Sequence, residues 1–167
     1  MITPAFVRTL AAYNSEMNRR LYGPAARLSD TQRREERGAF WGSLQATLAH
    51  ILWADRMWMS RFAGWEKPAG PLKQSAQWEQ DFSALAAARV ETDAGIERWA
   101  SEVTQAWLDE RLTWFSGAAN RESARRAAFS SRISSIIRRI IAARRMRSSP
   151  LWASAPRTPI SSSSCRR

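Results

Sequence analysis

The sequence is poor in the residues that form disulfides and metal sites. Cys165 is the only cysteine and His50 the only histidine among 167 residues, which excludes an internal disulfide and is typical of the reducing cytoplasm. No apolar run reaches the ~18 residues of a membrane span. Residues 1–20 also lack the basic start and apolar stretch of a secretory signal, so we expect a cytoplasmic protein. Phosphate-binding glycine loops, the Gly-x-Ser-x-Gly turn and cysteine pairs are missing as well.

Positive charge is concentrated at the C-terminal end of the chain. Residues 1–120 carry 14 Lys and Arg against 14 Asp and Glu, whereas residues 121–167 carry 12 Arg, no Lys and one acid, Glu122. The whole net charge of +11 therefore lies in the last 47 residues, which also hold 12 Ser. Two interpretations follow. Either this segment is a specialised basic appendage, or it is the wrong reading frame of a gene whose first part is intact.

Hydrophobic periodicity predicts that residues 1–120 are all-α, because apolar residues recur at helical spacing and no segment alternates like a strand. Thr3 and Pro4 are typical of a helix start, and Gly23-Pro24 of a helix end. The expected elements are a first helix up to residue 22, a polar connection over 24–36, a helix over 38–62, a loop over 64–70, a helix over 75–100 and a short helical piece over 104–113.

Three amphipathic helices leave a groove that a fourth helix usually fills. The segment 121–147 has isoleucines at helical spacing with arginines around them, at Ile133, Ile136, Ile137, Ile140 and Ile141. We therefore expect a basic amphipathic fourth helix over 121–147. Residues 148–167 are rich in Pro, Ser and Arg, so we expect a disordered tail there.

Residues 1–120 resemble the DinB-like family of damage-inducible bacterial proteins, which share a four-helix bundle with a metal site. The similar stretches are Tyr13-Asn14, Met17-Asn18, Leu21-Tyr22, residues 37–43, residues 47–52, residues 55–59, Arg61-Phe62, Asp81-Phe82, Leu85, Arg89, Asp93, Ile96 and Trp99. The resemblance implies a divalent-metal-dependent enzyme of the thiol-transferase or hydrolase-like kind, using zinc or nickel to lower the pKa of a bound thiol or water. It also implies a homodimer.

In that family three histidines hold the metal, and His50 lies where the ligand of the second helix should be. The other two form a His-x-x-x-His pair on the last helix, inside a stretch resembling N-H-Q-T-H-H-R-G-Q, because i, i+4 spacing puts both rings on one helical face. This chain has no such pair; Ile137 and Ile141 stand near those positions. We therefore expect no tight metal binding and little or no catalytic activity.

A change of reading frame accounts for the missing pair. Residues 136–144, I-I-R-R-I-I-A-A-R, can be written in codons that encode N-H-Q-T-H-H-R-G-Q when read one base earlier. Residues 145–150 can likewise give A-H-A-L-L-T, and residues 157–160 can give D-T-D-L. This compatibility predicts a single-base frameshift between about residues 118 and 131.

Other interpretations of the same residues stay open. His50 is either a structural histidine or the start of a weak site completed by water and a carboxylate. An arginine-rich amphipathic helix is also typical of a non-enzymatic protein that contacts nucleic acid or an anionic membrane, at least nonspecifically. The complete lack of Lys in residues 121–167 argues against evolved binding of that kind. A further interpretation is that the isoleucine face docks in the open groove as a substitute fourth helix.

Three smaller groups of residues have both a structural and a functional interpretation. Five tryptophans at helical spacing are expected in the core rather than in an aromatic cage: Trp53, Trp58, Trp78, Trp99 and Trp107. Asp55, Arg56 and Arg61 favour a surface ion pair over a functional polar cluster. Cys165 lacks an activating neighbour in the sequence and is expected to be incidental.

Overall fold

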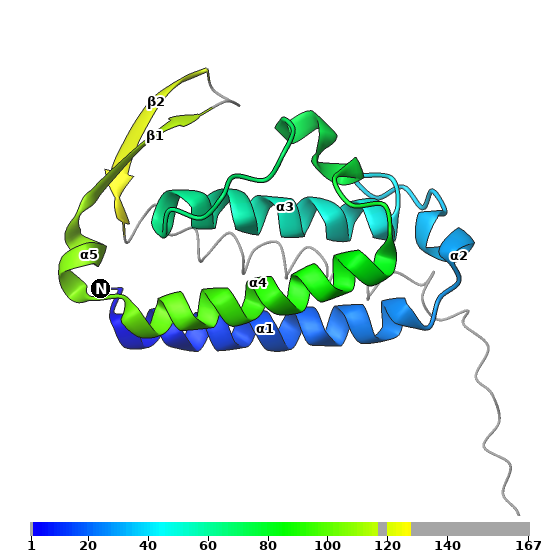
Figure 1. Cartoon of the computed structure of the whole chain (residues 1–167), viewed down its shortest axis with the longest axis horizontal. Coiled ribbons are helices and arrows are strands. Elements are labelled where there is room, and N and C mark those ends of the chain that lie inside the picture. The colour runs from blue at the N-terminus through cyan, green and yellow to red at the C-terminus, as the bar shows by residue number, and fades with distance from the viewer. Residues whose placement is uncertain (1, 117–119, 128–167) are drawn as a thin grey trace, which may run out of the picture.

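The computed structural model describes residues 2–116 and 120–127, and these residues are mostly helical, as the sequence predicts. The long helices α1, α3 and α4 lie alongside one another, and a two-stranded hairpin leaves the bundle at the α5 end (Figure 1). The elements in chain order are α1 (Pro4–Ala26), α2 (Asp30–Arg34), α3 (Leu44–Phe62), the 3-10 helix η1 (Leu72–Gln77), α4 (Phe82–Glu102), α5 (Gln105–Asp109), β1 (Arg111–Ser116) and β2 (Arg121–Arg126).

A capping side chain starts each long helix, and these caps correct two predicted boundaries. Thr3 accepts a backbone hydrogen bond at the start of α1, as expected. Ser43 and Asp81 do the same for α3 and α4, so these helices begin later than the predicted residues 38 and 75. Residues 38–43 instead form a tight turn, and η1 occupies the predicted start of the third helix.

The first helix also differs from its predicted end. It runs through Gly23 and Pro24 to Ala26. A proline in the last turn removes only one helical hydrogen bond. Ala25, in that turn, is buried against an apolar cluster that includes Leu48 and Leu52, and this burial favours continuing the helix.

The hairpin is the clearest departure from the predicted all-helical chain. The short piece expected over 104–113 ends as α5 at Asp109, and β1 follows directly. Residues 121–126, predicted as the start of a basic helix, pair antiparallel with β1 instead, from Arg111 opposite Arg126 to Ser116 opposite Arg121. In β1 the residues alternate between exposed and half-buried, a pattern too short to stand out in the sequence. Residues 128–147 of the predicted fourth helix and the tail 148–167, with Cys165, lie outside the described residues.

The core consists of two apolar clusters at successive levels along the helices. Cluster 1 lies at the α5 end and contains Val7, Ala11, Met59, Phe62, Ile96, Ala100, Val103 and Leu108. Cluster 2 lies toward α2 and contains Ala25, Leu48, Ala49, Leu52 and Leu85. On each long helix the residues between the two clusters include buried polar side chains.

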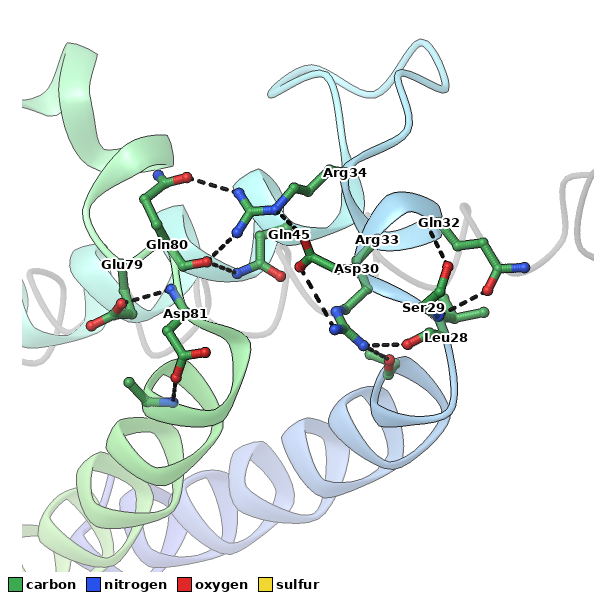
Figure 2. Close-up of polar contacts among 12 residues, drawn as sticks. Leu28, Ser29, Asp30, Gln32, Arg33, Arg34, Gln45, Glu79, Gln80 and Asp81 are labelled. Atoms are coloured by element: carbon green, nitrogen blue, oxygen red, sulfur yellow. Dashed lines mark hydrogen bonds and ion pairs between the residues drawn. The ribbon is translucent and has the colours of Figure 1, made fainter.

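Polar contacts close the α2 end of the bundle (Figure 2). The Arg34 side chain donates hydrogen bonds to the side chain of Gln80, at 2.8 Å, and to its carbonyl oxygen. Gln45 Nε2 on α3 donates to the same carbonyl oxygen at 3.2 Å. These contacts hold the segment before α4 against α2 and α3. Within the described ranges, no helix is both long and apolar enough to cross a bilayer.

Candidate functional site

His50, the candidate metal ligand, lies on α3 with its side chain buried. The residue is 8% exposed, and its Nδ1 atom lies 2.7 Å from Oγ of Ser75. Ser75 is fully buried and comes from η1, which packs against α3. The Ser75 hydroxyl also donates to the carbonyl oxygen of Leu72 at 2.7 Å. A separate short helix therefore holds one edge of the imidazole.

The indole of Trp41 covers the imidazole of His50. The ring centroids are 4.1 Å apart and the planes differ by 29°. Trp41 lies in the tight turn before α3, where Gly42 has a φ of +82°, a conformation that glycine adopts without strain. The loop that leads to η1 is tied to α3 as well, because Trp53 Nε1 donates to the carbonyl oxygen of Ala69 at 3.1 Å. Both neighbours of His50 thus belong to segments held by their own hydrogen bonds.

The residues present do not fit the three-histidine metal site that the family resemblance implies. Across residues 2–116 and 120–127, no three His, Cys, Asp or Glu side chains are grouped so that they could hold a metal ion. The positions near which the other two ligands would stand, Ile137 and Ile141, lie outside the described residues and carry hydrocarbon side chains. Zinc and nickel sites are built from imidazole, thiolate and carboxylate ligands. Only His50 of the expected set is available.

A buried ion network lies between the two apolar clusters and joins α1, α3 and α4. Arg89 donates from Nη1 to Asp55 Oδ2 and from Nη2 to Asp93 Oδ1, both at 2.6 Å. The side chains of Arg89 and Asp55 are each 2% exposed. From α1, Asn18 Nδ2 donates to both oxygens of Asp93 at 2.9 and 3.1 Å, and Asn14 Nδ2 donates to Oδ1 at 3.3 Å. Two side chains of α4, Arg89 and Asp93, therefore connect the polar groups of all three long helices.

The network contains two carboxylates and one guanidinium, so it carries a net negative charge when all three groups are ionised. Burial raises the pKa of Asp93, although Arg89 and the Asn18 amide oppose the shift. Burial alone would lower the pKa of Arg89, but Asp55 and Asp93 raise it overall. Arg89 therefore stays charged, and the buried site favours protonation of Asp93.

Lowering the pH toward 3.8, the ordinary pKa of an aspartate side chain, is expected to raise the contribution of Asp93 to the free energy of unfolding. Its pKa is higher in the folded than in the unfolded protein, so the folded state binds the proton first. The gain begins as pH falls through the folded pKa and is complete below the unfolded pKa. Urea unfolding at several pH values measures it, with Asp93→Asn as the variant that lacks the group.

An exposed carboxylate acts in the opposite direction at lower pH. Hydrogen bonds from Arg19 and Arg20 lower the pKa of Glu16 to about 2, so its contribution is lost only as pH falls from its ordinary value of 4.5 toward 2. The two effects therefore differ in sign, and the Glu16 effect continues below pH 3.8, where the gain from Asp93 is complete. If the free energies of unfolding of the wild type and Asp93→Asn changed equally as the pH was lowered from neutral to about 4, the raised pKa of Asp93 would be contradicted.

A small cavity borders the network on the side of cluster 1. Its walls are mainly apolar, from Val7, Ala11, Trp58, Met59, Phe62 and Trp99, and Asn14 and Asp55 also line it. It offers about 20 Å³ of room for the centre of a water-sized sphere. Room of this size holds about one water molecule or a few ligand atoms. In this conformation the cavity therefore does not accommodate a whole organic substrate.

The structure corrects the expected role of Asp55, Arg56 and Arg61. Asp55 is not part of a surface ion pair but is buried and bound to Arg89. Arg56 contacts two other residues of α4: its Nε donates to Thr92 Oγ1 at 3.0 Å, and its Nη2 lies 3.2 Å from Glu91 Oε2. The guanidinium of Arg61 lies over the Trp58 ring, 4.5 Å from its centroid. These three residues do not form one site.

The tryptophan expectation is confirmed. Trp53 is buried, Trp58, Trp99 and Trp107 pack against cluster 1, and Trp78 packs against cluster 2.

Two groups of buried polar residues were not predicted from the sequence. Ser75 gave no signal, and Arg89 with Asp93 drew attention only through the family resemblance, although charges between Leu85 and Ile96 on one apolar face could have indicated a buried pair.

Comparison with known proteins agrees with the architecture. The sequence model of the DinB family matches residues 1–128, which is more than three quarters of the chain. No curated protein and no solved structure gives a match. The match covers the three long helices, His50 and the buried ion network, so the chain belongs to the DinB family.

Proposed function

We propose that this chain descends from a divalent-metal-dependent enzyme of the thiol-transferase or hydrolase-like kind and no longer binds the metal tightly. The observation that carries the proposal is His50, a buried imidazole held in place on α3 of a DinB-family chain that has no other histidine. Ile137 and Ile141 stand near the positions where the resemblance implies the other two ligands. We also propose a homodimer and a cytoplasmic location, on family resemblance and on the single cysteine.

The extent of the family match supports a frameshift as the origin of the loss. The match ends at residue 128, inside the interval of about 118 to 131 in which the change of frame is expected. The charge imbalance begins at Arg121, in the same interval. An evolved basic helix would also have no reason to be compatible with codons that encode the family's histidine motif one base out of phase.

The purified protein is expected to contain far less than one equivalent of zinc or nickel, because a single imidazole holds these ions weakly. Elemental analysis after dialysis measures the content, and a chelator should leave the folded structure unchanged. The matched control is the chain with its frame corrected, which should regain a chelator-sensitive metal.

The coding DNA gives a second test of the same proposal. We expect one base to be missing or added between codons 110 and 165, and we expect the corrected frame to encode His-x-x-x-His. A stoichiometric, chelator-sensitive metal in the chain as printed, or codons incompatible with the shifted motif, would overturn the proposal.

A second candidate, binding to a polyanion, is favoured by the surface of the hairpin. Arg111 and Arg126 lie directly opposite each other and are exposed, with Phe115, 60% exposed, on the same face. Like charges in this position destabilise a strand pair, and bound phosphates would relieve the repulsion. Exposed aromatic rings beside arginines are also typical of surfaces that bind single-stranded nucleic acid.

Salt separates the two candidates. Polyanion binding should weaken steeply as the salt concentration rises from about 50 to 200 mM, because each neutralised phosphate releases a counterion. Retention on heparin or single-stranded DNA measures this, with Arg111→Gln as a variant in the part of the chain that precedes the charge imbalance. Binding that Arg111→Gln leaves unchanged would exclude the hairpin face as its source.

A further inference from the structure

Ser75 makes two short polar contacts but has only one hydroxyl hydrogen. Its Oγ lies 2.7 Å from the carbonyl oxygen of Leu72 and 2.7 Å from Nδ1 of His50. A carbonyl oxygen only accepts hydrogen bonds, so the hydroxyl hydrogen must point toward Leu72. The same oxygen can then only accept from the imidazole, which means that the hydrogen between Ser75 and His50 belongs to Nδ1.

We propose that Ser75 is a positioning residue that holds neutral His50 in one tautomer, with the hydrogen on Nδ1 and the lone pair on Nε2. The opposite tautomer would turn the hydroxyl toward His50. It would then leave two oxygen atoms, one from Ser75 and one from Leu72, at 2.7 Å without a hydrogen between them. Both Ser75 and His50 are buried, so such a contact is costly.

The consequence is that His50 accepts a proton, a hydrogen bond or a metal ion only through Nε2. Histidines that bind metals are commonly oriented by a hydrogen bond from the other ring nitrogen to a nearby oxygen. Here η1 supplies that oxygen, and Trp41 restrains the plane of the ring from a different loop. The half of the site contributed by α3 and η1 is therefore organised, although the other ligands are missing.

This inference rests on the proposed function only for the origin of His50, because the hydrogen bond exists whether or not a metal binds. The two can therefore fail separately. A chelator-sensitive metal would overturn the loss of the site and leave the tautomer intact. The wrong tautomer would overturn the role of Ser75 and say nothing about the metal.

Nitrogen NMR tests the tautomer directly, since His50 is the only histidine and its ring signals need no assignment among others. In the full-length protein, at a pH where the ring is neutral, we expect a protonated, pyrrole-type Nδ1 and an unprotonated, pyridine-type Nε2. In Ser75→Ala we expect the Nδ1 hydrogen to lose its acceptor, so that the two nitrogen shifts move toward each other. The matched control is Ser60→Ala, which removes another α3-associated hydroxyl, bonded to the Met57 carbonyl oxygen at 2.8 Å. It should leave both shifts unchanged.

The wild-type spectrum alone decides the main claim, even if Ser75→Ala fails to fold. A pyridine-type Nδ1 in the wild type would overturn the proposal. So would a folded Ser75→Ala whose ring shifts equal those of the wild type. Equal changes in Ser75→Ala and Ser60→Ala would also overturn it, because the shift would then report general loosening of α3.

Discussion

Replacement of Arg89 by methionine is expected to lower the free energy of unfolding by about 3–5 kcal/mol. The change leaves Asp55 and Asp93 buried without the guanidinium that binds both of them at 2.6 Å. Methionine fills a similar space but has no donor, so desolvation of two carboxylates is no longer offset. Urea unfolding followed by circular dichroism at constant pH measures the loss.

Two variants show whether the loss comes from the unpaired carboxylates. Arg19→Met removes an arginine of an exposed ion pair with Glu16 and should change stability little. Adding Asp55→Asn and Asp93→Asn to Arg89→Met removes both charges and should recover part of the lost stability. If Arg19→Met and Arg89→Met lowered the free energy of unfolding equally, the unpaired carboxylates would not be the cause of the loss. The same would follow if the triple variant recovered none of the lost stability.

Truncation of Phe62 to alanine is expected to cost about 3–5 kcal/mol as well. Its ring stacks on Trp99, with centroids 5.5 Å apart, and meets the edge of Trp107 at 5.8 Å. It also forms part of the cavity wall, so the truncation enlarges an existing void that these rigid aromatic neighbours cannot fill. Thermal or urea unfolding measures the effect.

The matched control is Phe40→Ala, which deletes the same ring at a residue that is 90% exposed. That change should stay within about 0.5 kcal/mol, because little apolar surface is buried there. Comparable losses in the two variants would mean that aromatic content, rather than burial in cluster 1, determines the stability.

Helical periodicity was enough to find the three long helices and the faces on which the tryptophans lie. Trp58 precedes Phe62 by four residues on α3 and Trp99 follows Ile96 by three on α4, spacings that return to one side of a helix, and both tryptophans pack against cluster 1. The helix ends were less predictable. Ser43 and Asp81 are ordinary polar residues in the sequence, and only the hydrogen bonds they accept show that the helices start after them.

The candidate site was predictable in part. The family resemblance identified His50, and the absence of other histidines indicated an incomplete ligand set. Its partner Ser75 could not be predicted, because it lies 25 positions further along the chain, beyond a loop whose path depends on the Trp53–Ala69 hydrogen bond. The strand pairing of residues 121–126 was also hidden, because nothing in their own pattern favours a strand.

By itself the sequence determined the helical class, the family resemblance, the single histidine and the uneven charge, because these depend on local periodicity, motif order and residue counts. Only the tertiary structure decided that Asp55 pairs with Arg89 in the core instead of with a neighbour on its own helix, and that Ser75 meets His50. Such pairs form between distant segments, where exclusion of water makes an unpaired charge or hydroxyl costly. That cost depends on which side chains the packed helices bring together.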